Sequence, residues 1–304
     1  MSKKAKRKVT VKDWISGARL RTLPLAVAPV AVGYGIASVV QAENLTLTLL
    51  ALGVSLSLQI GVNFANDYSD GIRGTDDFRV GPPRLTGSGR VEPKLVRNAA
   101  FASFAVAGTA GLAIVALTGL WWLIAVGAAC VVAAWFYTGG KRPYGYAGLG
   151  EIFVFVFFGL VATFGTAAIQ VPRFFGNADA LIWTSGAAIA VGLFASAVLM
   201  INNIRDIETD ISAGKKTLAV RVGRKWAKGI YLILLWTPLA LLYPYTLVFQ
   251  HTAFAYLTAF VIVPLTLIVV TAKSAPEYIL ALKLTSYTAL GYALLLTYGL
   301  VVIV

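Results

Sequence analysis

The 304-residue chain has few charges and few of the side chains that bind transition metals. Only 13% of its residues are charged, which is about half the fraction of an ordinary soluble domain. It contains one cysteine, Cys130, and one histidine, His251. A single cysteine inside an apolar run excludes an intrachain disulfide and a cysteine metal site. His251 falls between two apolar runs, so we interpret it as part of a helix connection rather than as a metal ligand.

In place of charge the chain has long uncharged stretches, and 58% of its residues are hydrophobic. A membrane-spanning helix needs about 20 apolar residues. The uncharged stretches predict nine such helices, at 22–42, 44–66, two in 98–140, 152–172, 180–204, two in 229–272, and 284–304. We therefore expect an all-α polytopic membrane protein. Residues 1–21 are expected to form a cytoplasmic N-terminal tail, and residues 22–304 the nine-helix domain.

The net charge of +13 would suit a nucleic-acid-binding protein, but the distribution of the charges favours a membrane topology instead. With nine spans, alternate loops lie on opposite sides of the membrane. Of the 26 Lys and Arg, only Arg173 then falls on the side away from the N-terminus. Short loops rich in Lys and Arg stay in the cytoplasm. We therefore predict a multi-pass protein of the plasma membrane with a cytoplasmic N-terminus, an external C-terminus and no nucleic-acid partner.

The most informative stretch begins at the end of the second uncharged run. It spans residues 63–77 and contains Asn66 and four carboxylates, Asp67, Asp70, Asp76 and Asp77. On a helix Asn66 and Asp70 stand four apart and Asp67 and Asp70 three apart, so all three share a face. Crowded carboxylates repel each other unless a cation neutralises them, and hard divalent cations prefer oxygen ligands. The stretch therefore predicts a magnesium site at the cytoplasmic end of a helix.

A second copy of this pattern ends the sixth predicted span. Asn202, Asn203 and Asp206 repeat the first motif at a constant offset, and Asp210 follows one turn later. We therefore predict two pseudo-repeated halves that each present an acidic helix end to one shared site. Charges at membrane depth are functional by default, which favours this interpretation over surface ion pairs. The predicted catalytic residues are Asp67, Asp70, Asp206, Asp210 and Arg205. The predicted metal ligands are Asn66, Asp67, Asp70, Asp206 and Asp210, with Asp76 and Asp77 left open.

Basic residues accompany the acids on the same side of the membrane. Carboxylates with basic neighbours suit a magnesium–diphosphate, because the metal bridges protein and phosphate oxygens and Arg supplies fixed donors to phosphate. Metal and cations together would neutralise a leaving diphosphate. An apolar chamber behind this mouth would hold a lipid tail, and aromatic rings could face a carbocation. The predicted substrate-binding residues are Asn66, Arg73, Arg84, Tyr137, Lys141, Arg142, Asn202 and Lys215.

At these residues the chain resembles the UbiA superfamily of intramembrane aromatic prenyltransferases, over almost its whole length. The family features are the N-D-x-x-D motif at Asn66, the D-x-x-x-D motif at Asp206, and the segment Tyr137-Thr138 between them. The superfamily pattern often has another Asp where this chain has Gly74, so Asp76 or Asp77 would have to substitute for it. The segments most similar to the branch that prenylates 1,4-dihydroxy-2-naphthoate are 18–24, 66–71, 81–85, 137–140 and 148–151.

The resemblance implies nine helices around a central cavity with a lateral opening to lipid. It also implies Mg²⁺ as cofactor, a polyprenyl diphosphate as donor and an aromatic acceptor. With 1,4-dihydroxy-2-naphthoate as the suspected acceptor, the product would be demethylmenaquinone, formed with loss of CO₂ and diphosphate. Two alternatives stay open, namely an acceptor such as 4-hydroxybenzoate and a membrane transporter, since internal repeats also suit transporters. The acids gather on one side of the membrane rather than at its midplane, which favours the enzyme.

Overall fold

The computed structural model describes residues 9–76 and 84–302, and within these ranges the chain is helical with no strand. Asp77 and the Gly-Pro-Pro segment at 81–83 lie outside the described residues. The first half contains α1 (Val11–Ala18), η1 (Leu20–Thr22), α2 (Pro24–Val39), α3 (Leu45–Ile72), α4 (Pro93–Thr118), α5 (Trp122–Phe136) and η2 (Tyr144–Ala147). The second half contains α6 (Gly150–Val154), η3 (Phe155–Val161), α7 (Ala162–Ala168), η4 (Phe174–Gly176), α8 (Ala178–Arg205), α9 (Ile207–Ser212), α10 (Leu218–Leu241), α11 (Tyr243–Val248), η5 (Gln250–Thr258), α12 (Ala259–Thr271) and α13 (Ala275–Val301).

The predicted all-α membrane fold is confirmed, and the count of nine spans holds approximately. Seven helices among the described residues are long and apolar enough to cross a membrane, and α2 gives an eighth when it is joined to the helix before it across a 49° bend. The remaining predicted span, the second of the two in 98–140, corresponds to α5, which is apolar but shorter. The last predicted span begins at Ala275 rather than at 284, because a helix can carry Glu277 and Lys283 near its N-terminal end.

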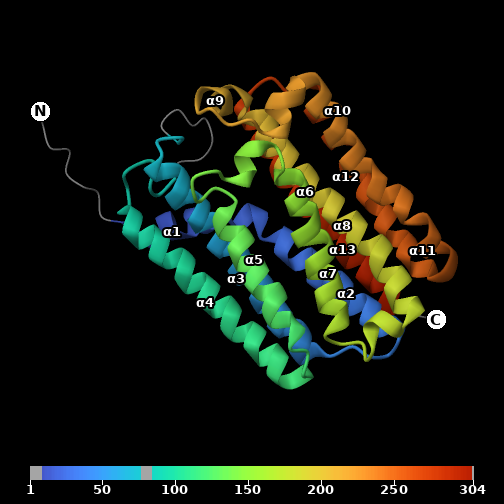
Figure 1. Cartoon of the computed structure of the whole chain (residues 1–304). Helices are drawn as coiled ribbons and strands as arrows, with labels where there is room; N and C mark the ends of the chain where they lie inside the picture. Colours follow the sequence, from blue (N-terminus) through green and yellow to red (C-terminus); the bar gives the residue numbers. More distant parts are fainter. Residues whose placement is uncertain (1–8, 77–83, 303–304) are drawn as a thin grey trace, which may run out of the picture.

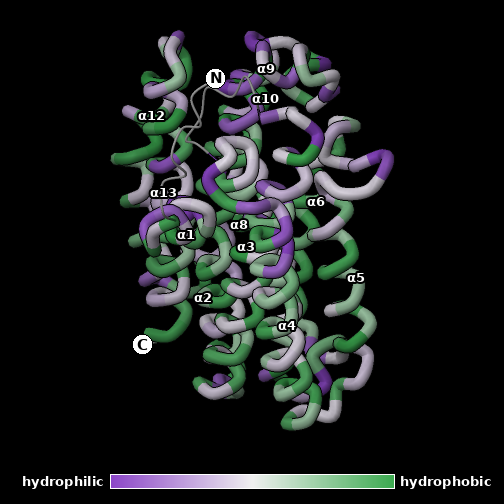
Figure 2. The backbone as a smooth tube through the Cα atoms, turned by 90° about the vertical axis from the view of Figure 1, so that its left-hand side faces the viewer, coloured by the Kyte–Doolittle hydropathy of each residue, from purple (hydrophilic) through white to green (hydrophobic). Residues whose placement is uncertain are grey.

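The helices stand side by side, with α4 and α5 at one edge of the molecule and α10 to α12 at the other (Figure 1). Between them lies α8, of which 72% of the apolar window is buried. Large side chains such as Phe194 and Met200 of α8 pack in the largest apolar cluster with Tyr292 of α13. The hydrophilic stretches gather toward the end that carries α9 and the α9–α10 connection (Figure 2). A bundle of this kind satisfies its backbone within each helix, which a membrane interior requires.

The span formed by α6, η3 and α7 is locally a π-helix, at η3. It crosses α8 at very close range, since a Cβ on Gly159 would lie 2.5 Å from the Cα of Gly192. Only a glycine pair allows two backbones to approach in this way. Single π turns inside α-helices are frequent at functional sites. Here the π segment and its flank place Phe153, Phe157 and Phe158 along an internal cavity.

Candidate active site

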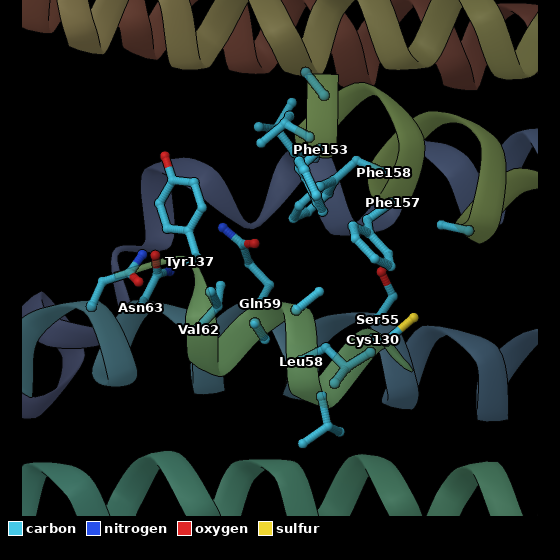
Figure 3. A pocket seen from close by; sticks show the side chains of 18 of the residues that line it. Ser55, Leu58, Gln59, Val62, Asn63, Cys130, Tyr137, Phe153, Phe157 and Phe158 are labelled. Carbon is cyan, nitrogen blue, oxygen red and sulfur yellow. The ribbon is translucent and has the colours of Figure 1, made fainter. Parts of the chain in front are cut away.

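A large cavity runs between the two halves of the chain and has a volume of about 810 Å³. Its walls come from α2 to α5 on one side and from α6 to α8 on the other, and they are largely apolar. Figure 3 shows the arrangement around one part of this space, with side chains from Ser55, Gln59 and Asn63 of α3, Tyr137 at the end of α5, and Phe153, Phe157 and Phe158. Residues of both acidic motifs line the same cavity, so the two helix ends that the sequence pattern pairs lie close together.

Asn66 and Asp70 of α3 line the cavity. The Asn66 amide oxygen accepts a 2.8 Å hydrogen bond from the Thr138 hydroxyl, which orients the amide. Asp70 is only 3% exposed, and its Oδ1 accepts a 2.6 Å hydrogen bond from the Tyr146 hydroxyl. Burial, followed by the Asp70 charge, raises the pKa of Tyr146, so the phenol keeps its proton and acts as a donor. The other Asp70 oxygen is thereby left for cations.

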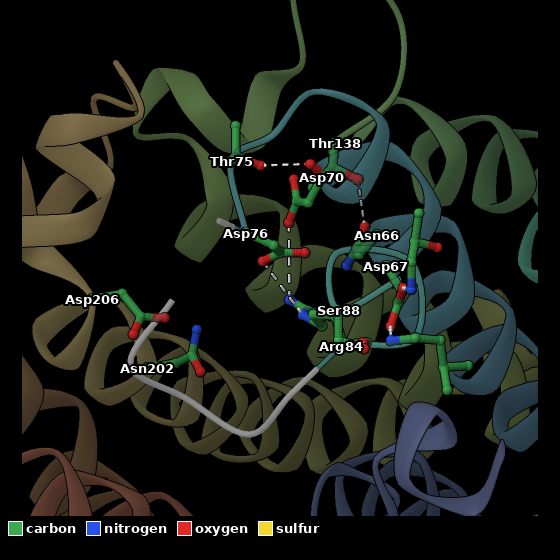
Figure 4. A network of polar contacts seen from close by, with 12 residues as sticks. Asn66, Asp67, Asp70, Thr75, Asp76, Arg84, Ser88, Thr138, Asn202 and Asp206 are labelled. Atoms are coloured by element: carbon green, nitrogen blue, oxygen red, sulfur yellow. Dashed lines mark hydrogen bonds and ion pairs between the residues drawn. The ribbon is translucent and has the colours of Figure 1, made fainter. Parts of the chain in front are cut away.

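Two cationic side chains approach the second oxygen of Asp70. Lys215 Nζ lies 3.6 Å from Asp70 Oδ2 and 3.9 Å from Asp210 Oδ1, so one ammonium group links the two motifs. Arg84 Nη2 lies 3.9 Å from Asp70 Oδ2, and its Nε lies 3.8 Å from Asp76 Oδ1. Figure 4 shows the contacts of Arg84 with Asp70 and Asp76, with Asn202 and Asp206 facing them from another helix.

Arg84 is 9% exposed and lines the cavity. Within the described residues its Nε and Nη1 atoms have no hydrogen-bond partner. Buried polar groups are normally satisfied, so each exception needs an explanation. A guanidinium that faces a cavity with unused donors suits an anionic ligand such as phosphate.

The second motif is organised around Arg205. This guanidinium donates to Asp206 at 2.7 and 2.5 Å and to the Asn202 amide oxygen at 2.9 Å. Asn202, Asp206 and Asp210 line the cavity, whereas Arg205 stands behind them. Arg205 is therefore a support for the acidic groups in this structure, and not a group on the cavity surface.

Several predicted site residues lie elsewhere. Asp67 is 1% exposed and is not among the residues that line the cavity. Arg73 donates instead to the backbone oxygens of Thr138 and Gly140. Lys141 and Arg142 are exposed and do not belong to the cavity wall. Tyr137 and Lys215, in contrast, both line the cavity as the sequence analysis expects of substrate-binding residues.

A polar strip on α3, which the acidic motifs do not indicate, continues from Asn66 into the apolar chamber. Gln59 is 6% exposed, and its Nε2 donates to the Thr22 hydroxyl at 2.8 Å. Its amide oxygen is buried and, among the described residues, has no hydrogen-bond donor. Asn63 donates to the backbone oxygen of Ala18 at 3.0 Å. The spacing of Gln59, Asn63 and Asn66 on one helix face could have revealed this strip.

The donor set fits magnesium only together with phosphate oxygens. Within the described residues, no three carboxylate, His or Cys side chains lie close enough to form a ready metal site. Mg²⁺ is usually held by one or two carboxylates, with waters and substrate phosphates completing its shell. Asp70 on one side of the cavity and Asp206 and Asp210 on the other meet that requirement. Lys215 and Arg84 neutralise the acids in this structure.

Comparisons with known proteins agree with this geometry. The UbiA prenyltransferase family matches residues 26–280. A 1,4-dihydroxy-2-naphthoate octaprenyltransferase from Mycobacterium tuberculosis is 53% identical over 220 residues, which cover 72% of this chain and 73% of that protein. The enzyme of the same name from Escherichia coli is 37% identical over 250 residues, or 80% and 79% of the two chains.

Solved structures share the fold at low sequence identity. A UbiA homolog from Aeropyrum pernix superposes with a TM-score of 0.67 at 18% identity, over 91% of this chain and 97% of that one. A UbiA homolog from Archaeoglobus fulgidus, solved with GPP and Mg²⁺ bound, gives a TM-score of 0.63 at 15% identity, over 96% and 100% of the two chains.

Proposed function

Since the chain belongs to the UbiA prenyltransferase family, we propose that it transfers a polyprenyl group from polyprenyl diphosphate to 1,4-dihydroxy-2-naphthoate. This reaction yields demethylmenaquinol, the reduced form of demethylmenaquinone, together with CO₂ and diphosphate, and belongs to menaquinone biosynthesis. The observation that carries the proposal is the meeting of two acidic motifs and two cations at one apolar cavity. Relatives that are 37% to 53% identical carry the name of this activity.

Mg²⁺ is the proposed cofactor, held by Asn66 and Asp70 from α3 and by Asn202, Asp206 and Asp210 from α8 and α9. When bound, it supplies positive charge to the diphosphate oxygens and so stabilises the leaving group. The A. fulgidus homolog was solved with GPP and Mg²⁺. Arg84 and Lys215 are placed to donate to the same phosphate oxygens, because both already stand among the carboxylates. Their charges are preorganised, which is the main source of electrostatic catalysis.

The apolar part of the cavity would hold the prenyl tail. As the C–O bond to diphosphate breaks, positive charge develops on the allylic carbon, and the rings of Tyr137 and Phe153 line this space. Aromatic faces attract such a charge. The apolar wall also excludes water, which would otherwise capture the cation. The carboxyl-bearing carbon of the acceptor then forms the new C–C bond, and breaking its bond to the carboxylate releases CO₂ and restores the aromatic ring without an external oxidant.

The test is a reconstituted reaction. Purified protein in lipid or detergent would receive octaprenyl diphosphate, Mg²⁺ and either 1,4-dihydroxy-2-naphthoate or 4-hydroxybenzoate, and the products would be identified by mass. We expect the decarboxylated prenyl naphthalenediol, no reaction after chelation of the metal, and recovery when Mg²⁺ is restored. Product from 4-hydroxybenzoate alone would transfer the assignment to another acceptor. No prenyl transfer to any aromatic acid would refute the enzymatic function.

Gln59 is expected to bind the acceptor through its buried amide oxygen. A dihydroxynaphthoate carries hydroxyl donors, which an otherwise unsatisfied carbonyl oxygen in the cavity wall can accept. Gln59→Leu should raise KM for the acceptor about fivefold to tenfold, the value of one neutral hydrogen bond, with KM for the donor little changed. Ser55→Ala is the matched control, because Ser55 lies one turn away on α3 and its hydroxyl donates to the backbone oxygen of Ala26. An equal rise in both KM values would contradict this role.

We further propose that the cavity mouth faces the cytoplasm, with the N-terminus inside and the C-terminus outside. The support is the near-complete segregation of Lys and Arg to one side, since Arg173 alone falls on the other. In a Cys130→Ala background, single cysteines at Ser88 and Ala178 would be labelled with a membrane-impermeant thiol reagent on intact cells. Both positions are exposed. We expect labelling at 178 only, and labelling at 88 alone would reverse the orientation.

A further inference from the structure

Both carboxylate oxygens of Asp67 accept hydrogen bonds from the backbone of one neighbouring segment. Its Oδ2 accepts a 2.8 Å hydrogen bond from the backbone N–H of Leu85, and its Oδ1 accepts one of 2.8 Å from the N–H of Thr86. The side chain is 1% exposed. A buried carboxylate that accepts two backbone N–H groups is in a strong, charge-assisted arrangement. Both of its oxygens are therefore engaged by the segment that follows Arg84.

We infer that Asp67 is a positioning residue that acts through Arg84, and not a metal ligand. By fixing the backbone at Leu85 and Thr86, it sets where the guanidinium of Arg84 stands relative to Asp70 and Asp76. The inference rests on the proposed function, in which Arg84 binds diphosphate. It assigns Asp67 a role that its place in an acidic motif does not indicate.

The packing around Asp67 shows that this segment is docked tightly on α3. A Cβ on Gly71 would lie 2.4 Å from Thr86 Cγ2 and 2.9 Å from the backbone nitrogen of Gly87. Leu85 is 2% exposed and belongs to an apolar cluster with Phe64 of α3. The turn at Leu85 is thus held on α3 in two ways, by apolar packing of the Leu85 side chain and by the hydrogen bonds of the Asp67 carboxylate. Arg84 directly precedes this turn, so the docked turn fixes one side of its backbone.

The second residue of the second motif makes a comparable anchoring contact. Asn203 occupies the position equivalent to Asp67, and its amide donates a 2.9 Å hydrogen bond to Glu151 at the start of α6. Asn203 lines the cavity together with Asn202 and Asp206, so it differs from Asp67 in reaching the cavity as well as anchoring its helix. In both halves the second residue of the motif ties its helix to another segment. This parallel supports an anchoring role for Asp67.

A double-mutant cycle tests the inference by direct binding. The affinity for inorganic pyrophosphate in the presence of Mg²⁺ would be measured by calorimetry for wild type, Asp67→Asn, Arg84→Ala and the double variant. An Asn side chain would turn an N–H group toward a backbone N–H, which breaks one anchor bond. Asp67→Asn alone should weaken pyrophosphate binding about tenfold, the usual size of a supporting-shell effect. In the Arg84→Ala background, Asp67→Asn should weaken pyrophosphate binding less than about threefold. The effects of substitutions in residues that act as a unit are not additive.

A second variant disturbs the same docking without touching the acid. Gly71→Ala would push Thr86 away, and it should reproduce the loss of affinity and its dependence on Arg84. Gly53→Ala on the same helix is the control, because a Cβ there meets only Ala110 at 3.9 Å. Additive effects of Asp67→Asn and Arg84→Ala would overturn the inference and leave the proposed function standing. Failure of the wild-type protein to bind pyrophosphate with Mg²⁺ would overturn both.

Discussion

Replacing Asp70 by Asn is expected to reduce kcat/KM for the prenyl diphosphate on the order of 10²–10³-fold, the usual effect of removing one preorganised charge from an active site. Asp70 is the carboxylate on which Tyr146, Arg84 and Lys215 converge. Asn has the same shape but no charge, so it would neither balance the two cations nor hold Mg²⁺. Asp206→Asn should behave alike, since Asp206 faces the same cavity from α8. Steady-state kinetics over a range of Mg²⁺ concentrations would measure both effects.

The fold should survive these changes, because Asp70 and its partners line a cavity rather than the packed apolar core. Size-exclusion profiles and thermal unfolding in detergent would verify this. Asp179→Asn is the matched control, since Asp179 lies in the first turn of α8, at the opposite end from Asp206. It should retain full activity. Normal turnover in Asp70→Asn would show that the acidic motif does not serve catalysis.

Filling the apolar chamber with a larger side chain should make the enzyme prefer donors with shorter prenyl chains. Gly111 and Gly165 line the cavity, and a Cβ at either position would meet no atom within 4 Å. Gly111→Leu or Gly165→Leu would therefore occupy empty space, and each would favour its helix by roughly 1 kcal/mol, because glycine is a poor helix former. We expect kcat/KM for octaprenyl diphosphate to fall roughly 10- to 100-fold, since forcing extra methylenes into a filled space costs about 1–3 kcal/mol. Activity with geranyl diphosphate should be retained.

The comparison of long and short donors separates a blocked chamber from a damaged enzyme. Gly229→Leu on α10 supplies the control, because that glycine is equally open but does not line the cavity. It should leave the ratio of the two kcat/KM values unchanged. Gly165→Leu could instead lower kcat/KM equally for the long and the short donor. In that case the chamber would not be the tail site, and the tail would have to leave the protein through another opening.

The sequence by itself determined the membrane fold and the identity of the main acidic groups. Uncharged runs of sufficient length can only be helices in a bilayer, because no other single-chain segment satisfies its own backbone there. The helical repeat placed Asn66 and Asp70 about 40° apart around α3, close enough to serve one site. The constant offset of the second motif then predicted that Asp206 would share that site. These conclusions needed only local geometry and the cost of exposing charge or backbone to lipid.

Only the tertiary structure decided which of the neighbouring polar residues reach the cavity. Asp67 projects about 60° beyond Asp70 around the helix, and the turn at Leu85 and Thr86 occupies that side and takes both of its oxygens. Lys141 and Arg142 are as basic as Lys215, yet Lys215 alone among these three lines the cavity. Spacing along one helix fixes relative angles within that helix. It cannot fix which loop packs against each angle, because that depends on contacts between residues far apart in the chain.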